Sequence, residues 1–289
     1  MTTAGRDADI DASPREGRGL FSLMRATARA ALDYALPPRC PGCGMIVGAD
    51  RQFCLDCWSS VHFLDEPACT RCSIPLPTAL PGTAVECGAC MAEAPPFDGA
   101  PAAVAYGQVA RTVALRLKYG RRTGHARLMG ALMARHLLAL GPVEKMLLLP
   151  VPLHRRRLWS RGFNQAALIA EALSRLTGAA HDPHGLTRIR ATPLLRGKGR
   201  RERERVVAGA FALADHAQLR TAGRHLVLID DVHASGATLR AAARALRRSG
   251  ATRISALTWA RVVPDAMMSV NLFDFADMDS DMRAERMTG

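Results

Sequence analysis

Four C-x2-C pairs constrain this chain more than any other feature of its sequence. All eight cysteines lie between Cys40 and Cys90, and the rest of the chain has none. Each pair presents two thiolates from one tight turn, and two pairs complete a closed tetrahedral site for Zn²⁺. The segment has little apolar periodicity with which to build a core, so bound metal would supply its folding energy. The predicted ligands are Cys40, Cys43, Cys54, Cys57, Cys69, Cys72, Cys87 and Cys90.

The spacing leaves the pairing of these knuckles open. Neighbouring pairs can share one ion in sequence, or the first and third knuckles can share one ion in a cross-braced arrangement. Disulfides or redox pairs are a poor alternative, because a redox C-x-x-C usually occurs singly on a βαβ frame. An iron–sulfur cluster is also bound by thiolates, but four such knuckles fit paired zinc better. We therefore predict two structural Zn²⁺ ions in a small double zinc ribbon, with no ligand position open for water.

The end of the cysteine-rich segment marks a change in composition. Pro and Gly are frequent before it, and "EAPPFDGAPAAVAYG" (residues 93–107) is typical of a linker into a new domain near Ala100. Alternating apolar runs and amphipathic stretches follow. The predicted division is a disordered tail over 1–22, a double zinc ribbon over 23–98, an α/β domain over 99–263 and an acidic tail over 264–289.

Apolar patterning in the second domain predicts an α/β fold. Three continuous apolar runs, at 145–152, 225–231 and 253–262, are typical of strands buried on both faces of a parallel sheet. Helical spacing occurs over 115–140, with a turn near 120–124, and again over 164–178 and 237–250. Strands that alternate with helices indicate a doubly wound, mostly parallel sheet.

The charge and the termini restrict the partners and the location. The net charge of +13 and the sequence pI near 10.2 favour polyanions such as nucleic acid, phosphate-rich metabolites or anionic membrane. No apolar run reaches the ~18–20 residues of a membrane span. The N-terminus lacks the apolar region of a secretory signal. A cytoplasmic protein is expected, with its cysteines as thiols or metal ligands.

Two adjacent aspartates, Asp230 and Asp231, stand where an apolar strand is predicted to end. Open α/β sheets bind ligands at the carboxyl ends of their strands. The following "VHASGAT" leads into a helix N-terminus, where backbone N–H groups and the helix dipole attract anions. Gly236 allows close approach, and Ser235 and Thr238 add hydroxyls. A phosphate in this loop and a diol on the carboxylates describe a ribose 5-phosphate. The plainer alternative is a capped helix after a generic strand; dinucleotide and P-loop motifs are absent.

The stretch "VLIDDVHASGAT" resembles the phosphoribosyl-pyrophosphate (PRPP) motif of type I phosphoribosyltransferases. "LLLPVPLHRRRLWSRGFNQAALIAEAL" (residues 147–173), "LRLKYG" and "VVAGAF" are similar to segments of the ComF family, whose members join a zinc ribbon to a phosphoribosyltransferase domain. The chain is identified as a member over about residues 32–263. The resemblance implies a type I phosphoribosyltransferase fold, PRPP bound with Mg²⁺, and a role in DNA uptake during natural competence. It also implies single-stranded DNA and other competence proteins as partners.

The resemblance assigns roles to residues that match the family motifs. The acids that bind ribose match Asp230 and Asp231, and Lys118 and Arg161 match the family's LKY and RGFNQ runs. Ala234 and Ser235 stand where two threonines are common, which removes one hydroxyl donor. The loop that receives the 5-phosphate matches Val232, His233, Ala234, Ser235, Gly236, Ala237 and Thr238, and candidate partners of pyrophosphate, in a loop after a strand, are Arg155, Arg156 and Arg157.

Two departures from the family pattern keep two functions open. Leu195 stands where the family usually has Gln, and Val206 where it usually has Asn, in an expected active-site lid. These changes favour a non-catalytic adaptor that binds nucleic acid or partners, with PRPP as a regulatory ligand. The intact aspartate pair favours PRPP binding and a phosphoribosyltransferase.

Two other features keep two readings each, and a third is a candidate for base stacking. The basic run from Arg196 to Arg205 is either a solvated face or an anion-facing lid. His233 is expected to point to solvent or to ligand. Trp159 lies in the basic stretch "RRRLWSR" and is the best of the three tryptophans for base stacking.

Overall fold

The computed structural model describes residues 37–65, 67–76, 79–80, 83–120, 122–192 and 199–264. The predicted tail at 1–22 lies outside these ranges, as does the acidic tail apart from Pro264. Leu195 also lies outside the described residues.

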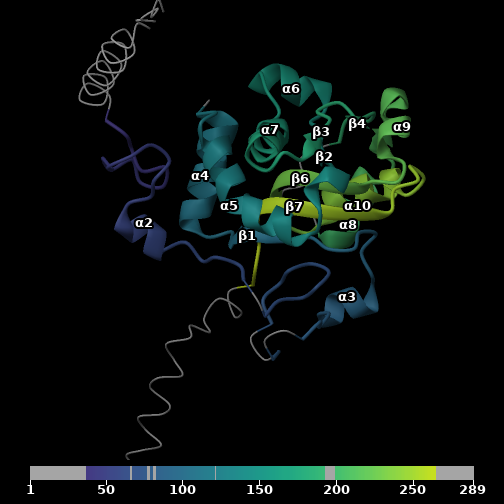
Figure 1. The fold of residues 1–289 in the computed structure, drawn as a ribbon, viewed down its shortest axis with the longest axis horizontal. Helices are drawn as coiled ribbons and strands as arrows, with labels where there is room; N and C mark the ends of the chain where they lie inside the picture. The colour runs from purple at the N-terminus through teal and green to yellow at the C-terminus, as the bar shows by residue number, and fades with distance from the viewer. Residues whose placement is uncertain are drawn as a thin grey trace, which may run out of the picture.

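A five-stranded sheet forms the centre of the molecule (Figure 1), with the order β1-β7-β6-β2-β3. Every neighbouring pair of strands is parallel. The three predicted apolar runs form β2, β6 and β7, and every residue of β2 is buried, as expected for a strand covered on both faces. The strands of this sheet are β1 (Ala102–Ala105), β2 (Met146–Pro150), β3 (Ala180–His181), β6 (His225–His233) and β7 (Arg253–Arg261).

Helices cover both faces of the sheet, which confirms the predicted doubly wound fold. The apolar sides of α4, α5 and α7 pack with one face of the sheet in the larger core. The other face packs against α10, with a small antiparallel pair of β4 (Leu186–Arg188) and β5 (Phe211–Leu213) beside it. The helices of this domain are α4 (Gln108–Tyr119), α5 (His125–Ala139), η1 (Val143–Lys145), α6 (Arg155–Arg161), α7 (Gln165–Thr177), α8 (Arg200–Val207), η2 (Asp215–Ala217), α9 (Gln218–Thr221) and α10 (Ala237–Leu246).

The helix ends follow the predicted turns with one difference. The turn expected near 120–124 separates α4 from α5, and Gly178, at φ +77°, ends α7 in the left-handed conformation. α10 ends four residues before Gly250, because Leu246 is its last residue that reaches the core. Across the described ranges, no helix has both the length and the apolar character needed to cross a membrane.

Two segments differ from the sequence-based expectation. Part of the predicted linker forms β1, a buried strand that pairs with β7. Its alanines have little strand preference of their own, so the pairing and burial create the strand. The arginines predicted to lie in a loop, Arg155 to Arg157, instead form the first turn of α6. His154 begins this helix, because its ring accepts a hydrogen bond from the amide of Arg156 at 3.3 Å.

The cysteine-rich segment contains the same turn twice. The amide of Gly44 donates to the carbonyl of Cys40 at 2.9 Å, and the amide of Ser73 donates to that of Cys69 at 2.8 Å. In each half a five-residue helix follows the third cysteine, α2 (Leu55–Ser59) in the first and α3 (Gly88–Ala92) in the second. α2 lies beyond α4 and α5, whereas α3 lies on the side of α8 and α10 (Figure 1).

Candidate functional site

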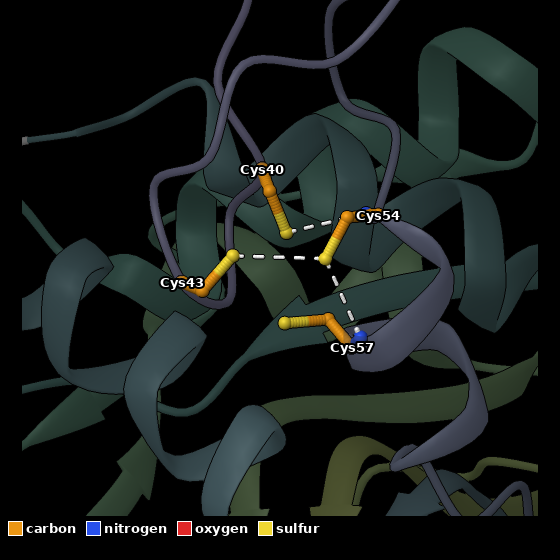
Figure 2. A group of neighbouring side chains, drawn as sticks. All are labelled: Cys40, Cys43, Cys54 and Cys57. Carbon is orange, nitrogen blue, oxygen red and sulfur yellow. Dashed lines mark hydrogen bonds between the residues drawn. The ribbon is translucent and has the colours of Figure 1, made fainter.

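The first four cysteines form one metal-binding cluster. Their sulfur atoms lie within 4.8 Å of one another and point toward a common centre in Figure 2. The sulfurs of Cys43 and Cys54 are 3.6 Å apart, close to the ~3.8 Å expected between thiolates about 2.3 Å from a tetrahedral Zn²⁺. The ligands of this first site are Cys40, Cys43, Cys54 and Cys57.

Backbone amides favour the thiolate form of one of these ligands, Cys40, whereas burial raises the pKa of Cys57. Burial alone would raise the pKa of Cys40, but backbone N–H groups, led by that of Cys54 at 3.3 Å, lower it to about 6. Gly42 lets the knuckle close, because a Cβ there would lie 2.6 Å from the sulfur of Cys57. The donor set and its spacing therefore fit Zn²⁺.

The last four cysteines repeat this arrangement. The sulfurs of Cys72 and Cys87 are 3.7 Å apart, and the amide of Cys87 donates to the sulfur of Cys69 at 3.2 Å. Burial opposes it, but backbone hydrogen bonds lower the pKa of Cys69 to about 7. The clusters use neighbouring pairs, so the cross-braced alternative is wrong. The second site consists of Cys69, Cys72, Cys87 and Cys90.

A cavity of about 230 Å³ lies at the carboxyl end of β6, where the phosphate loop was expected. Asp230 lines it, and β6 continues two residues beyond Asp231, so the aspartates lie within the strand and not at its end. Gly236, at φ +75°, turns the chain into α10, whose first turn has no side-chain cap. Uncapped N–H groups at a helix start suit an anion. The loop residues that line the cavity are Val232, His233, Ala234, Ser235, Gly236, Ala237 and Thr238.

The two aspartates differ in their electrostatic surroundings. Asp231 is buried and forms an ion pair with Lys118 of α4. Burial alone would lower the pKa of Lys118, but the charge and hydrogen bond of Asp231, together with the charge of Asp230, outweigh burial and raise the pKa. Burial and the neighbouring Asp231 raise the pKa of Asp230 to about 8. Asp230 is therefore the acid that a cation or a hydroxyl donor would help to ionise.

The structure brings the two other motif segments together beside this pair. The guanidinium of Arg161 lies over the ring of Tyr119, 5.3 Å from its centroid, and donates to the side chain of Gln165 at 2.6 Å. The end of α4, which carries Lys118, therefore meets the end of α6 and the start of α7. On α6, Arg155 and Arg156 are exposed and Arg157 is half-buried.

Two arginines near the aspartates have no individual signal in the sequence. Arg203 of α8 lines the cavity, which favours the anion-facing reading of the basic run at this residue. Burial and the neighbouring Arg157 lower the pKa of Arg188, while the charge of Asp230 opposes that shift. In the sequence, Arg203 is one of several cations in a basic run, and Arg188 lies in a stretch that contains no motif. Neither residue could therefore be singled out.

Three other expectations can be compared with the structure. His233 is 4% exposed and contacts Arg261, so it does not point to solvent; it lines the cavity, and its role toward a ligand stays a prediction. Val206 packs against the core on the α10 side of the sheet. Among the tryptophans, Trp159 is 91% exposed, whereas Trp259 is fully buried. Trp159 is thus free to stack on a base, and its role stays a prediction.

Comparisons with known proteins match both parts of the chain. A model described as "Double zinc ribbon domain" matches residues 31–95, and one described as "Phosphoribosyl transferase domain" matches residues 183–272. The "DNA utilization protein YhgH" of Escherichia coli K12 is 32% identical over 197 residues, 66% of this chain and 82% of that protein. The "Competence protein F" of Haemophilus influenzae is 33% identical over 39% of this chain and 49% of its own length. For the "Competence protein ComFC" of Bacillus subtilis, the identity is 36% over 42% of this chain and 46% of that protein.

The eight cysteines thus form the two sites of a double zinc ribbon, and the parallel sheet with its loop after β6 is the phosphoribosyltransferase domain. With these two domains and with the similarity to the Escherichia coli protein, the chain belongs to the ComF family.

Proposed function

We propose that this chain binds PRPP with Mg²⁺ at the carboxyl end of β6 and acts as a phosphoribosyltransferase in DNA uptake during natural competence. The cavity that joins Asp230 to the uncapped start of α10 carries the proposal. It combines a carboxylate for a ribose diol with amides for a phosphate. The names of the relatives, DNA utilization and competence proteins, support the cellular role.

The 5-phosphate is assigned to the loop over residues 232–238. Backbone N–H groups at the start of α10 bind it, Ser235 and Thr238 add hydroxyl donors, and Arg203 adds positive charge. Asp230 and Asp231 accept hydrogen bonds from the ribose hydroxyls. Binding therefore favours the ionised form of Asp230, whose pKa is raised in the free protein.

The reaction breaks the bond between C1′ of ribose and pyrophosphate, and it forms a bond from C1′ to an acceptor. Negative charge develops on the leaving pyrophosphate, and Lys118, Arg161 and Arg155 to Arg157 stabilise it electrostatically. When bound, Mg²⁺ supplies further positive charge to the pyrophosphate oxygens. Carboxylate and phosphate oxygens are its preferred ligands, and the Asp230–Asp231 pair offers two carboxylates. Helix α8, whose Arg203 lines the cavity, would help to exclude water from the reacting carbon.

The test is a calorimetric titration of PRPP and MgCl₂ into zinc-loaded protein. We expect one site per chain in the wild type and no binding in the Asp230→Asn, Asp231→Asn double variant. Asp215→Asn, an exposed position outside the cavity, makes the same chemical change and should bind normally.

Absence of binding by folded wild-type protein would contradict the proposal. Equal binding by the double variant would place PRPP elsewhere. A screen of acceptors for release of pyrophosphate then decides whether turnover occurs.

A second candidate function is a non-catalytic adaptor that binds single-stranded DNA. The 91% exposure of Trp159, on a helix whose Arg155 and Arg156 are also exposed, favours it. Binding constants should fall linearly on a log–log salt plot, with a slope of about 0.7 per phosphate contacted. Trp159→Ala should weaken binding by about 1–3 kcal/mol. Salt-independent binding would count against this function.

A further inference from the structure

A buried arginine in the first turn of α10 contacts two acids that are far apart in the sequence. Arg240 is 7% exposed, and its amide donates to the carbonyl of Gly236 at 2.8 Å, where the helix begins. Its Nη1 atom lies 3.5 Å from a carboxylate oxygen of Glu93, and its Nε atom lies 3.8 Å from one of Glu204. Arginine is rarely buried unless it is paired, so these acids compensate its charge inside the fold.

Glu93 connects this arginine with the second zinc ribbon. It directly follows α3, and its amide donates to the carbonyl of Ala89 at 3.2 Å, between the ligands Cys87 and Cys90. Its own carbonyl accepts a hydrogen bond from Nη2 of Arg240 at 3.4 Å. The backbone and the side chain of Glu93 therefore both contact the guanidinium, which is thereby held at the end of the ribbon.

Glu204 connects the same arginine with α8. This helix has eight residues, and its apolar contacts are at its end, where Val207 is fully buried in the core on the α10 side and Val206 packs against that core. Residues 200–205 are all charged. The side chain of Glu204 is only 18% exposed, so its pairing with Arg240 holds the part of α8 that precedes the valines.

The residue next to Glu204 faces the phosphate loop. Arg203 lines the cavity together with Gly236 and Ala237. Its Nε atom is buried and has no hydrogen-bond partner among the described residues. A buried donor without a partner is costly, and a phosphate oxygen in the cavity would satisfy it. The direction of Arg203 depends on how α8 is held, because Glu204 is its neighbour on that helix.

We propose that Arg240 positions Arg203 for the 5-phosphate, because it holds α8 through Glu204 and is itself held by Glu93. In this proposal, which rests on the proposed function, Arg240 is a positioning residue that does not touch the ligand. It is not among the residues that line the cavity. Loss of its guanidinium frees the first turns of α8, and Arg203 is then no longer held over the loop.

Hydrogen exchange of peptides that cover residues 200–207 tests the hold on α8 without PRPP. In zinc-loaded Arg240→Gln, we expect exchange to be about tenfold faster than in the wild type, the size expected for one lost charge-assisted contact. Arg244→Gln is the matched control. Arg244 lies one turn later on α10 and is exposed, so its loss should leave exchange in α8 unchanged.

A second variant keeps the buried guanidinium and removes one of its partners. Glu204→Gln should speed exchange in α8 by a similar factor, whereas the same change at Glu144, an exposed position of η1, should not. If Arg240→Gln does not fold, unchanged exchange in Glu204→Gln is enough to overturn the proposal. A folded Arg240→Gln protein whose α8 stays as protected as in the wild type would overturn it too.

Calorimetry with PRPP and MgCl₂ tests whether the hold on α8 acts through Arg203. If the wild type binds, Arg203→Gln and Glu204→Gln should each weaken binding about tenfold. The double variant should bind no more than about twofold more weakly than Arg203→Gln alone, because the effect of Glu204 on the ligand passes through Arg203. Arg244→Gln should bind normally.

Two outcomes of this cycle have different meanings. Losses that multiply to about a hundredfold in the double variant would show that Glu204 acts by another route, and the positioning role would be overturned. If the wild type binds no PRPP, the PRPP proposal fails, while hydrogen exchange still decides whether Arg240 holds α8.

Discussion

The two zinc sites have the same ligands and the same turn, but they are embedded differently in the molecule. In the first, Cys40 and Cys57 belong to the main core and pack with Val109 and Val113 of α4. In the second, the buried cysteines form a small cluster of their own with Ile74, Leu76 and Cys87. The zinc ribbon around this cluster contacts the domain through Glu93, whose carboxylate lies 3.5 Å from the buried guanidinium of Arg240.

This difference connects each ribbon with a different side of the candidate site. The guanidinium of Arg116 on α4 donates to the carbonyl of Pro41 at 2.8 Å in the first knuckle. Two residues later Lys118 pairs with Asp231. The first ribbon therefore supports the helix that neutralises Asp231. The second ribbon contacts α10, the helix after the loop beyond Asp230, through the hydrogen bond from Arg240 to the carbonyl of Glu93. Four predictions test this division, from the largest expected effect to the smallest.

Removing one cysteine ligand from each zinc site should lower the free energy of unfolding by different amounts. Cys40→Ser should lower the free energy of unfolding by more than about 5 kcal/mol, because a structural zinc contributes about 10 kcal/mol or more and the domain core loses a packed cysteine. Cys69→Ser occupies the matching position and should cost about 1–3 kcal/mol, with the main unfolding transition retained. Urea unfolding followed by circular dichroism measures both. Equal losses would contradict the comparison.

Lys118→Met should destabilise the domain by about 2–4 kcal/mol, because it leaves the buried carboxylate of Asp231 without its cation. The further change Asp231→Asn should restore most of that loss, since it removes the uncompensated charge. Lys145→Met, at the exposed end of η1, serves as the control and should cost little stability. Additive losses in the Lys118 and Asp231 double variant would show that the pair is not coupled in solution.

The affinity for PRPP should depend on pH through Asp230. Its raised pKa of about 8 means that the ligand-free protein loses stability as the pH rises from about 4 toward 8. Binding needs the ionised acid, so affinity should rise about tenfold between pH 7 and pH 9. In the Asp230→Asn variant, the affinity for PRPP that remains should no longer depend on pH. Calorimetry in buffers of different ionisation enthalpy should show one proton released near pH 7. A flat profile in the wild type would contradict the assignment.

A comparison of two glycines with similar φ angles measures how strongly the ring of His233 restrains the loop. Gly236 and Gly162 have φ of +75° and +83°, but only a Cβ at Gly236 would meet another side chain within 4 Å. Each alanine variant should cost about 1–2 kcal/mol from backbone strain. Gly236→Ala should cost about 1 kcal/mol more because the His233 ring must move. Thermal unfolding compares them, and equal losses would show that the ring does not restrain the loop.

The sequence predicted elements whose signal is local. The apolar runs of β2, β6 and β7 and the cysteine knuckles needed no knowledge of distant contacts. β1 escaped prediction because four residues, three of them alanine, become a strand only through pairing with β7. α6 was read as a loop because its start depends on a histidine cap.

The sequence predicted the motif of the candidate site but not the residues that hold this motif in place. The aspartates and the glycine turn lie together in the sequence. The contact between His233 and Arg261 depends on the order of strands, in which β6 and β7 are neighbours. The roles of Arg188 and Arg203 likewise depend on how β4 and α8 fold back toward the end of β6. Nothing local in the sequence carries that information.

The most direct test of the central claim is a crystal structure of the zinc-loaded chain with PRPP and Mg²⁺. The account predicts the 5-phosphate on the amides between Ala234 and Thr238, and the ribose hydroxyls on Asp230 and Asp231. The pyrophosphate should lie toward Lys118 and Arg161, and His233 should remain buried against Arg261. PRPP bound away from the end of β6, or an unchanged ligand-free loop at saturating PRPP, would contradict the account.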